Sequence, residues 1–524
     1  MTASFASLAP SAGRRILALR LPLLSIDRVR RKGSPAGQPA DAPLVAVARI
    51  DNALRIVALD ERATAAGLAR RMALASARAI HPVLAVVEAD PAADAALLER
   101  IADWCDRFTP LVALDPPSGL LLDVTGAAHL AGGERPLLDR VRAGLTAQGF
   151  HVQAALAGTA AAARALAAFA DGTIAAPGRE AEAVAGLPVG ALGLDAETAG
   201  GLSRAGLKTI GAVAERTRHE LAARFGAGLL ARLDEALGRG ERPITPRLPV
   251  PDYTAERRFA EPVATEDIIR DTLAGLAATL AGMMERRAEG ARRVEASFFR
   301  ADGAVRRLAV ETGRPTRDPA LLDRLFRERL EALADPLDPG FGFDLIRLAA
   351  LRADPLDPAP ATFDGREQEE GDVAALADRL AARLGPRRVL RFLPQDSHVP
   401  EASERLAPAQ RSAAAPGWPT AAEPGEPPRR PLRLFSRPEP VEAIAEVPDG
   451  PPVRFVWRRA VHRVMRAEGP ERIAMEWWRS TEGLPTRDYF RVEDQDGRRF
   501  WLYRDGIYGR ETAAPRWYVQ GLFG

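Results

Sequence analysis

Leu120-Leu121-Leu122-Asp123-Val124-Thr125-Gly126 is the stretch of sequence that decides the fold. Its three leucines and Asp123 predict a buried strand, and Thr125-Gly126 predicts the turn that ends this strand. Just upstream, Leu111–Leu114 is a second short apolar run, and the residues Asp115-Pro116-Pro117-Ser118 between the two runs are typical of a tight turn. The sequence therefore predicts a β-hairpin over residues 111–124.

The segments on either side of this hairpin predict a small mixed α/β domain. The apolar run from Ile16 to Leu24 predicts a first strand. Residues 44–60 alternate apolar and polar side chains, which predicts two short strands around a turn at Asp51-Asn52. Helical or alternating spacing predicts further strands at 83–88 and 151–157 and further helices at 62–79, 91–107, 134–149 and 159–170.

The remainder of the chain changes character more than once. Residues 186–240 contain only short helices and glycine turns. Residues 253–352 return to an α+β pattern, with helices expected at 266–286 and 319–333 and strands at 292–299, 304–311 and 343–350. One more helix is expected at 372–384, and a linker rich in Pro, Ala and Glu over 399–430.

The C-terminal region differs in composition from everything before it. It holds five of the seven tryptophans and four of the five tyrosines of the chain. Short apolar runs alternate there with glycine turns, which predicts a separate small β domain.

Composition narrows the classes of function. The 524 residues carry a net charge of +2, so any contact with nucleic acid has to come from local clusters of charge. The single cysteine, Cys105, excludes a disulfide framework and a cysteine-based metal site within one chain, and the six histidines have no ligand-like spacing. No apolar run approaches the ~20 residues that span a bilayer, and Ile16–Leu24 lacks the pattern of a signal peptide. We expect a cytoplasmic protein.

The hairpin and its neighbours resemble the palm of the Y-family, lesion-bypass DNA polymerases, where the corresponding run reads S-x-D-E, an aromatic residue, and then L-D-x-T-G. The segments Ala66-Gly67-Leu68, His81-Pro82 and Gly186-Leu187-Pro188-Val189 follow the order of that family from fingers to thumb. The resemblance extends over residues 16–352. It implies a multidomain α+β fold with a helix-hairpin-helix in its thumb. The expected divisions are palm and fingers 1–172, helical thumb 173–248, little finger 249–353, helix and linker 354–430, and a C-terminal β-rich domain 431–524.

The departures from the Y-family pattern concern the catalytic carboxylates. Polymerases use two divalent ions about 3.5–4 Å apart, and Mg²⁺ requires oxygen ligands. The family's D-x-D falls near Leu19-Arg20-Leu21, and its D-E pair falls on Ser118-Gly119. Asp123 remains, and we interpret it as a strand-end residue that bonds the following turn. We therefore expect degenerate positions Leu19, Leu21, Ser118 and Gly119, no metal, no cofactor and no polymerase activity.

The tail carries a narrower resemblance. Glu476-Trp477-Trp478, Arg487-Asp488-Tyr489, Arg499-Phe500-Trp501 and residues 517–523 are similar to the tail of the ImuB family of bacterial mutasome proteins. This resemblance implies a non-catalytic adaptor of error-prone translesion DNA synthesis in the SOS response to DNA damage. It implies as partners DNA, the sliding clamp, a RecA-like ImuA-type protein and a separate error-prone C-family polymerase, and no membrane.

Two groups of residues are candidates for contact with DNA. Residues 206–211 lie between two amphipathic helices and resemble a helix-hairpin-helix, whose backbone N–H groups face a phosphate. Gly206, Lys208, Thr209 and Gly211 are its candidate contacts, although an ordinary helix–helix turn has the same pattern. On the expected little-finger strands, Arg292, Arg293, Arg306 and Arg307 are placed either to bind a duplex backbone or to lie in solvent.

Clamp binding and partner binding have candidates near the C-terminus. Pro431-Leu432-Arg433-Leu434-Phe435 keeps the apolar anchors of a bacterial clamp-binding peptide, so Leu432, Leu434 and Phe435 are its candidate contacts. Residues 359–363 and 520–523 are weaker matches. Core packing accounts for most tail aromatics, and the rest are candidate interface anchors. The candidate partner-binding residues are Trp477, Trp478, Trp501 and Trp517.

Two alternative functions stay open. An active Y-family polymerase would need other carboxylates, such as Asp115 and Asp123, but Asp115 precedes two prolines and nothing replaces the pair on the first strand. The other alternative is a simple DNA-binding protein that uses only the helix-hairpin-helix. This alternative does not explain the aromatic residues of the C-terminal region.

Overall fold

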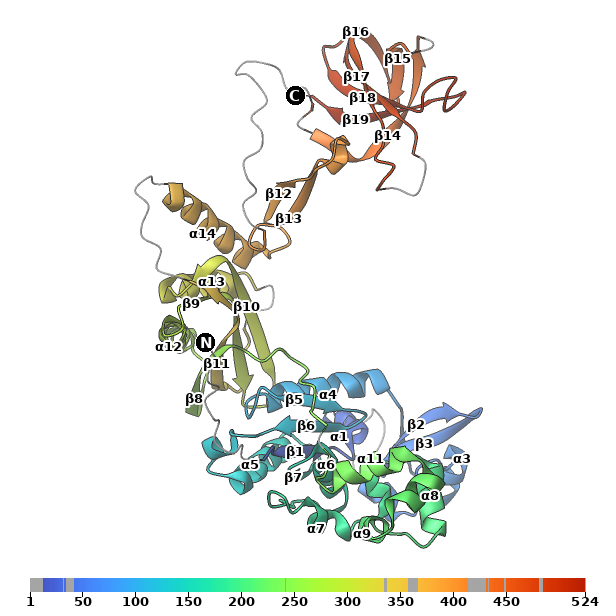
Figure 1. Cartoon of the computed structure of the whole chain (residues 1–524), viewed down its shortest axis with the longest axis vertical. Helices are drawn as coiled ribbons and strands as arrows, with labels where there is room; N and C mark the ends of the chain where they lie inside the picture. Colours follow the sequence, from blue (N-terminus) through green and yellow to red (C-terminus); the bar gives the residue numbers. More distant parts are fainter. Residues whose placement is uncertain are drawn as a thin grey trace, which may run out of the picture. The chain divides into compact units, whose positions relative to one another are not determined.

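The computed structural model of the chain describes residues 13–31, 33, 42–240, 242–333, 337–356, 366–412, 430–431, 433–446, 449–479 and 484–523. The chain divides into two compact units, Met1–Phe363 and Asp364–Gly524. Helices and strands are mixed in the first unit, and the second is built mainly of strands (Figure 1).

A four-stranded sheet in the order β5-β6-β1-β7 forms the palm-like centre of the first unit (Figure 1). Its strands are β1 (Ile16–Arg20), β5 (Val112–Asp115), β6 (Gly119–Asp123) and β7 (Gln153–Ala157). The β5–β6 hairpin confirms the prediction made from residues 111–124. Strand β1 lies antiparallel to both of its neighbours, β6 and β7.

The two faces of this sheet are covered by different helices. Successive strand residues point to opposite faces, so Leu17 and Leu19 join one apolar cluster while Ile16 and Ala18 join another. The first cluster includes residues of α4 and α5, and the second includes residues of α6. These helices are α4 (Pro91–Cys105), α5 (Glu134–Ala147) and α6 (Ala160–Phe169).

The first strand is shorter than the apolar run that predicted it. β1 ends at Arg20, and helix α1 (Leu24–Arg31) begins where the strand was expected to end. The N–H of Leu24 donates to the carbonyl of Leu21 at 3.2 Å, which closes a turn that contains Pro22. Proline has no N–H to donate to a ladder, so it ends the strand despite the apolar residues around it.

A smaller sheet in the order β3-β2-β4 forms the fingers-like part. Asp51 and Asn52 have φ values of 49° and 60°, which confirms the predicted turn between β2 and β3. The single helix expected over 62–79 is wrong, because Gly67 (φ 81°) and Arg71 (φ 69°) adopt left-handed backbone conformations that separate α2 from α3. The elements are β2 (Leu44–Ile50), β3 (Ala53–Leu59), α2 (Glu61–Ala65), α3 (Leu74–Ile80) and β4 (Ala85–Glu88).

The thumb-like part consists of short helices, as its glycine-rich sequence predicts. Their leucines and valines join Ile16, Ala18 and Leu121 of the palm sheet in one continuous apolar cluster. The helices are α7 (Glu180–Ala185), α8 (Ala196–Arg204), α9 (Ile210–Ala214), α10 (Arg218–Phe225) and α11 (Ala227–Ala236).

The little-finger part is a four-stranded sheet in the order β10-β9-β11-β8, with two helices. Strand β8 was not predicted, because its sequence is charged and only Tyr253 and Ala255 in it are buried. The elements are β8 (Tyr253–Val263), α12 (Glu266–Glu285), β9 (Glu289–Arg300), β10 (Val305–Thr316), α13 (Pro319–Glu331) and β11 (Phe343–Pro355).

The second unit contains a helix, a hairpin and a closed barrel in the order β14 to β19. The hairpin corrects the sequence interpretation, since β13 lies within the segment expected to be linker. The barrel confirms the predicted C-terminal β domain. Among the described residues, no helix has the length and apolar content needed to cross a membrane. The elements are α14 (Arg366–Leu384), β12 (Leu390–Pro394), β13 (Glu404–Pro408), β14 (Arg433–Ala445), β15 (Pro452–Trp457), β16 (Ala460–Ile473), β17 (Arg487–Asp494), β18 (Arg499–Asp505) and β19 (Arg516–Leu522).

Candidate functional site

Strands β1 and β6 bring the four degenerate positions together. Arg20 is the Cα partner of Gly119, and the N–H of Leu21 donates to the carbonyl of Ser118 at 2.8 Å. Two segments about 100 residues apart in sequence therefore meet at one end of the central strand pair. The resemblance to Y-family polymerases predicts the metal carboxylates of a palm at this position, and Leu19 and Leu21 there are only 2% and 0% exposed.

The residues at this position do not fit a pair of divalent ions. Leucine and glycine side chains offer no oxygen, and Arg20 brings a positive charge that donates to Oε1 of Gln153 at 2.6 Å. A Cβ atom on Gly119 would lie 2.8 Å from the carbonyl oxygen of Asp115, so an acidic side chain does not fit there unless the hairpin moves. Among the described residues, no three His, Cys, Asp or Glu side chains are grouped as metal ligands.

The carboxylates nearest in sequence have other partners. Oδ2 of Asp115 accepts from Nε of Arg164 at 2.8 Å. Asp27 on α1 accepts from the backbone N–H of His151 at 2.9 Å, and burial raises the pKa of Asp27. Asp123 lies at the far end of β6 from Gly119, and its Oδ1 accepts from the N–H of Thr125 at 3.0 Å. This last bond confirms that Asp123 holds the turn that follows it.

The predicted helix-hairpin-helix exists as two helices, α8 and α9, joined by a short turn. Gly206 has a φ of 82°, a conformation that favours glycine, and Lys208 is exposed. The side chain of Thr209 caps α9 by accepting from the N–H of Ala212. A Cβ on Gly211 would lie 3.0 Å from the carbonyl of Ala185, so this glycine allows α9 to pack against α7. Gly211 therefore has a packing role of its own.

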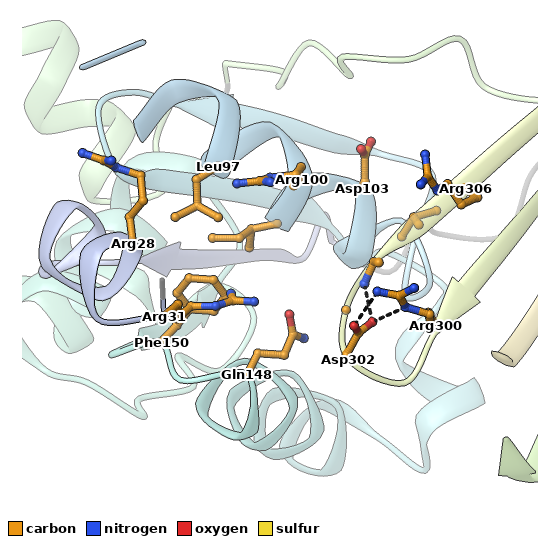
Figure 2. Close-up of a pocket in the computed structure, with 14 residues that line it drawn as sticks. Arg28, Arg31, Leu97, Arg100, Asp103, Gln148, Phe150, Arg300, Asp302 and Arg306 are labelled. Carbon is orange, nitrogen blue, oxygen red and sulfur yellow. Dashed lines mark hydrogen bonds and ion pairs between the residues drawn. The ribbon is translucent and has the colours of Figure 1, made fainter. Parts of the chain in front are cut away.

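The four predicted little-finger arginines differ in their surroundings. Arg292 donates to the carbonyl of Thr312 and to Asp354, whereas Arg293 is exposed with its nearest carboxylate 3.9 Å away. Arg306 is exposed and lines a cavity (Figure 2).

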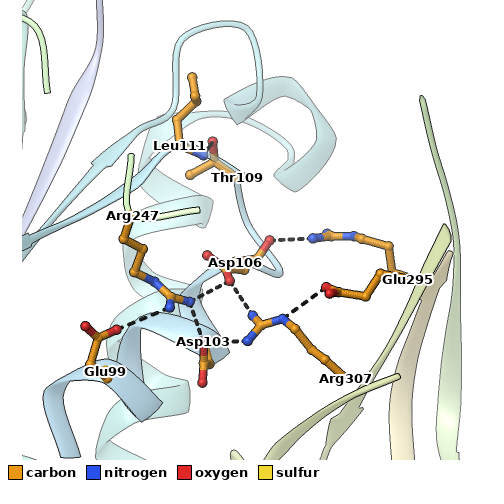
Figure 3. Close-up of polar contacts among 9 residues, drawn as sticks. Glu99, Asp103, Asp106, Thr109, Leu111, Arg247, Glu295 and Arg307 are labelled. Carbon is orange, nitrogen blue, oxygen red and sulfur yellow. Dashed lines mark hydrogen bonds and ion pairs between the residues drawn. The ribbon is translucent and has the colours of Figure 1, made fainter. Parts of the chain in front are cut away.

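Arg307 belongs to a network of ion pairs between the little finger and helix α4 (Figure 3). Its guanidinium donates to Asp103 at 2.6 Å and Asp106 at 2.5 Å, and Glu295 lies 3.5 Å away. Arg247, on the segment that leads to the little finger, donates to the same two aspartates. Arg307 is therefore not available to a phosphate while these pairs hold. Sequence reasoning missed this network, because its members lie up to 204 residues apart.

Burial dominates the electrostatics of this network. It raises the pKa of Asp106 to about 6, although Arg247 and Arg307 act in the opposite direction. Burial likewise raises the pKa of Glu295. The backbone carbonyl of Asp106 also accepts from Arg347 at 2.7 Å.

The predicted clamp-binding segment lies partly outside the described residues, since Leu432 is not among them. Leu434 is paired with Gly521 across β14 and β19, and the Phe435 ring is stacked on Trp457 with centroids 6.2 Å apart. Phe435 is half-buried against the barrel core, and Leu434 is half-buried against a second cluster that contains Tyr489 and Trp501. The weaker candidate 520–523 lies on the partner strand, with Gln520 only 1% exposed, and residues 359–363 fall outside the described residues.

The four predicted partner-binding tryptophans separate into two pairs. Trp501 and Trp517 are 1% and 7% exposed, so they are not surface anchors, and Trp517 belongs to the apolar core of the barrel. Alternation along β18 places Trp501 on the face opposite Phe500 and Leu502, where it is buried in a second cluster with Tyr489 and Tyr503. Trp477 and Trp478 follow β16 and are 80% and 59% exposed. Their ring centroids lie 5.8 Å apart, which makes a continuous exposed aromatic surface.

Comparison with known proteins first defines the class. Residues 39–168 match the impB/mucB/samB family, and residues 251–362 match the C-terminal domain of the same family. DNA polymerase IV 1 of Mesorhizobium japonicum is 27% identical over 39% of this chain and 47% of its own length. A solved structure described as a post-insertion binary complex of Dbh DNA polymerase shares 14% identity, covers 64% of this chain and 97% of its own, and has a TM-score of 0.39. The first unit has the Y-family polymerase-like fold.

A longer match then defines the family. Protein ImuB of Caulobacter vibrioides is 43% identical over 461 residues, which are 86% of this chain and 98% of that protein. A match of 461 residues is longer than the first unit, so it extends into the C-terminal unit. The chain belongs to the ImuB family.

Proposed function

We propose that the chain is a non-catalytic adaptor of error-prone translesion DNA synthesis in the SOS response, and that it acts in the cytoplasm. Its partners would be DNA, the sliding clamp, a RecA-like ImuA-type protein and an error-prone C-family polymerase. One observation supports the proposal: Leu19, Leu21, Ser118 and Gly119, the positions that the resemblance to Y-family polymerases assigns to metal-binding carboxylates, lie together at one end of strands β1 and β6.

Primer extension by the purified full-length chain tests the absence of catalysis. The assay contains primed template, all four deoxynucleotides and Mg²⁺ or Mn²⁺, with DNA binding by the same preparation followed by fluorescence anisotropy. We expect DNA binding without extension, because the side chains of Leu19, Leu21 and Gly119 offer no oxygen to a metal ion. Extension that copurifies with the chain through successive columns would show that it is a polymerase with an unrecognised metal site.

Contact with DNA is proposed to come from the hairpin between α8 and α9 and from the exposed little-finger arginines. Helix α9 has only five residues, so we expect the exposed charge of Lys208 to contribute more than the helix dipole. Lys208→Ala should weaken duplex binding by about two- to fivefold at low salt. Arg232→Ala, on the exposed surface of α11, is the matched control. If Lys208→Ala and Arg232→Ala bind duplex DNA with equal affinity, the hairpin between α8 and α9 is not a DNA contact.

Arg293 and Arg306 are proposed as further backbone contacts, since both are exposed on β9 and β10. Arg292 and Arg307 would reach a phosphate only after their present bonds open. Neutralising Arg293 and Arg306 together should reduce the salt dependence of DNA binding. An unchanged salt slope would exclude these two residues.

Clamp binding at residues 431–435 is proposed to use Leu434 and Phe435, with Leu432 beside them. Because the two anchors also pack on the barrel, Leu434→Ala/Phe435→Ala is compared with Val441→Ala, a half-buried residue of the same strand. Loss of clamp pull-down in the double variant alone would support the site. Equal loss in both variants would indicate that the barrel has to be folded and that no clamp peptide lies there.

Trp477 and Trp478 are proposed as anchors for a protein partner, since large exposed aromatic side chains are typical of interface centres. Trp477→Ala/Trp478→Ala should reduce capture of the C-family polymerase or the ImuA-type protein while leaving the thermal unfolding of the barrel unchanged. Tyr508→Ala, an exposed aromatic residue of the same unit, is the control. Full capture of both partners by the double variant would contradict this assignment.

A further inference from the structure

A cavity of about 520 Å³ lies between the palm-like part and the little finger (Figure 2). Helices α1 and α4 line one side, and the turn between β9 and β10 lines another. A Cβ on Gly303 in this turn would overlap Oε1 of Gln148, so the turn packs directly on the residue that follows α5. The walls thus come from segments far apart in sequence that the fold brings together.

The charged lining of the cavity is predominantly positive. Five arginines contribute to it, namely Arg28, Arg31, Arg100, Arg300 and Arg306, against two aspartates, Asp103 and Asp302. The two aspartates are already engaged, since Asp103 accepts from Arg247 and Arg307 and Asp302 accepts from Arg300. The lining therefore carries an excess of positive charge that its own carboxylates do not balance.

Two of these arginines are not used by the fold as ion-pair partners. Arg28 pairs with Asp94 at 2.6 Å, whereas Arg31 and Arg100 make no ion pair with any residue that the structure describes. The guanidinium of Arg31 lies over the ring of Phe150, 4.2 Å from its centroid. Figure 2 shows Arg31 and Arg100 on opposite walls, with both guanidinium groups inside the space between α1 and α4.

The proximity of Arg31 and Arg100 has an energetic cost without an anion. Burial, followed by the positive charge of Arg100, lowers the pKa of Arg31, and the carboxylates of Asp302 and Asp27 offset this only in part. A multiply charged anion between the two side chains would relieve the repulsion. Arginine suits this role, because its planar fork donates two parallel bonds to a phosphate or carboxylate.

The cavity is separated from the proposed DNA contacts of the thumb. Leu97 and Ile101 of its wall belong to the apolar cluster on the α4 face of the palm sheet. The hairpin residues Leu207 and Ile210 belong to the cluster on the opposite face. A duplex held by the hairpin between α8 and α9 therefore does not account for the arginines of the cavity.

We infer that this cavity is a phosphate-binding site, which takes the phosphate groups of a free nucleotide or of a single nucleic-acid strand. Its volume falls in the range of small-ligand sites, about 300–1,000 Å³, which suits a compact polyanion. An acidic protein segment would instead need an extended groove or a free strand edge to satisfy its backbone. The site goes beyond the proposed adaptor function, and its test depends on Arg31 and Arg100, which are not among the proposed DNA contacts.

Binding measurements on the full-length chain test the site. The probes are inorganic triphosphate and deoxyadenosine triphosphate, followed by calorimetry, and a short labelled oligothymidine, followed by anisotropy. Arg31→Ala/Arg100→Ala should weaken binding of at least one probe by about tenfold or more, because two charge-assisted contacts are lost. Arg140→Ala, an exposed arginine of α5 outside the cavity, is the control and should bind as the wild type does.

The outcomes separate the two sources of phosphate. Weakened binding of the triphosphates identifies a free nucleotide, and weakened binding of the oligothymidine alone identifies a strand. Unchanged affinity for every probe would overturn the inference, as would displacement of bound triphosphate by equimolar polyglutamate. Lys208→Ala should leave triphosphate binding intact, so failure of the thumb contact and failure of this site give different results.

Discussion

The thumb and the little finger are attached to the same palm-like sheet by different forces. On the thumb side, Ile16, Ala18 and Leu121 of the sheet share one apolar cluster with α6 and the helices that follow it. On the little-finger side, the contacts to α4 are mainly charged, with Arg247 and Arg307 joined to Asp103 and Asp106 (Figure 3).

The ionic attachment extends along the end of α4. Arg107 donates two bonds to Asp344 of β11, at 2.7 and 2.9 Å, and Arg347 of the same strand donates to the carbonyl of Asp106. These side chains are partly exposed, with 11% to 28% of the surface of Arg107 and Asp344 accessible. Water and salt therefore reach the contacts.

This difference predicts which of the two attachments, that of the thumb or that of the little finger, is weakened by a change in solution conditions. Apolar packing depends on the area removed from water and is insensitive to moderate salt. Partly exposed ion pairs weaken as salt screens them. We expect the thumb to stay attached under conditions that release the little finger, and four experiments test this contrast.

The largest loss of stability is expected from a substitution in the apolar cluster that joins the thumb to the sheet. Leu166→Ala removes a fully buried side chain of α6 and should lower the free energy of unfolding of the first unit by about 2–5 kcal/mol. Phe169→Ala, on the same helix but 52% exposed, is the control and should change it by less than about 1 kcal/mol. Urea unfolding followed by circular dichroism measures both. Similar costs for the two variants would mean that α6 is not the joint between sheet and thumb.

A substitution in the ion-pair network at α4 should lower the stability of the first unit by a smaller amount. Arg247→Ala leaves Asp103 and Asp106 with Arg307 as their remaining side-chain partner, and it should destabilise the first unit by about 2 kcal/mol. Arg218→Ala removes an equally well-formed pair with Asp234 on the surface of the thumb, at 2.8 Å for both bonds. This control should change stability by less than about 1 kcal/mol. If Arg218→Ala lowers the free energy of unfolding as much as Arg247→Ala does, the ion pairs at α4 are no more stabilising than a pair on the surface.

The pH dependence of the ionic attachment has a defined sign. Because burial raises the pKa of Asp106 to about 6, the folded chain keeps a proton between pH 4 and 6 that the unfolded chain has lost. The contribution of Asp106 to the free energy of unfolding should therefore fall as pH rises from about 4 to about 6, by about 2 kcal/mol, and become level above about pH 7.

The difference in stability between the wild type and Asp106→Asn isolates this contribution across a pH series. Asp234 provides the opposite case, since its side-chain hydrogen bond with Arg218 lowers its pKa. The difference between the wild type and Asp234→Asn should be present at neutral pH and be lost as pH falls below about 4. The same sign for both aspartates would contradict the effect of burial on Asp106.

The smallest effect is expected from salt. Raising the ionic strength from about 0.1 M to about 1 M shortens the Debye length from about 10 Å to about 3 Å. Hydrogen exchange should then become about twofold faster in residues 99–107 and 305–311, and stay unchanged in residues 196–214. Faster exchange in the thumb segment as well would show that salt destabilises the whole unit and would remove the contrast.

Prediction from sequence succeeded where the determinants are local. The hairpin over 111–124 follows from two apolar runs and a proline turn, and Asp51-Asn52 predicts its own turn. It failed where backbone conformation or burial depends on distant contacts. Strand β8 has a charged sequence and exists because β11 pairs with it, and Trp477 and Trp501 cannot be distinguished as surface and core by residue type.

The sequence by itself determined the class of this protein, the residues other than carboxylates at positions 19, 21, 118 and 119, and a β-rich tail, because these depend on the order of residues and on local patterns. Only the tertiary structure decided that Leu21 and Ser118 are neighbours, that Arg307 is occupied by α4, and that Arg31 and Arg100 face a common cavity. The physical reason is that a guanidinium binds whichever anion the fold brings within about 3 Å, and that choice is made between residues far apart in the chain.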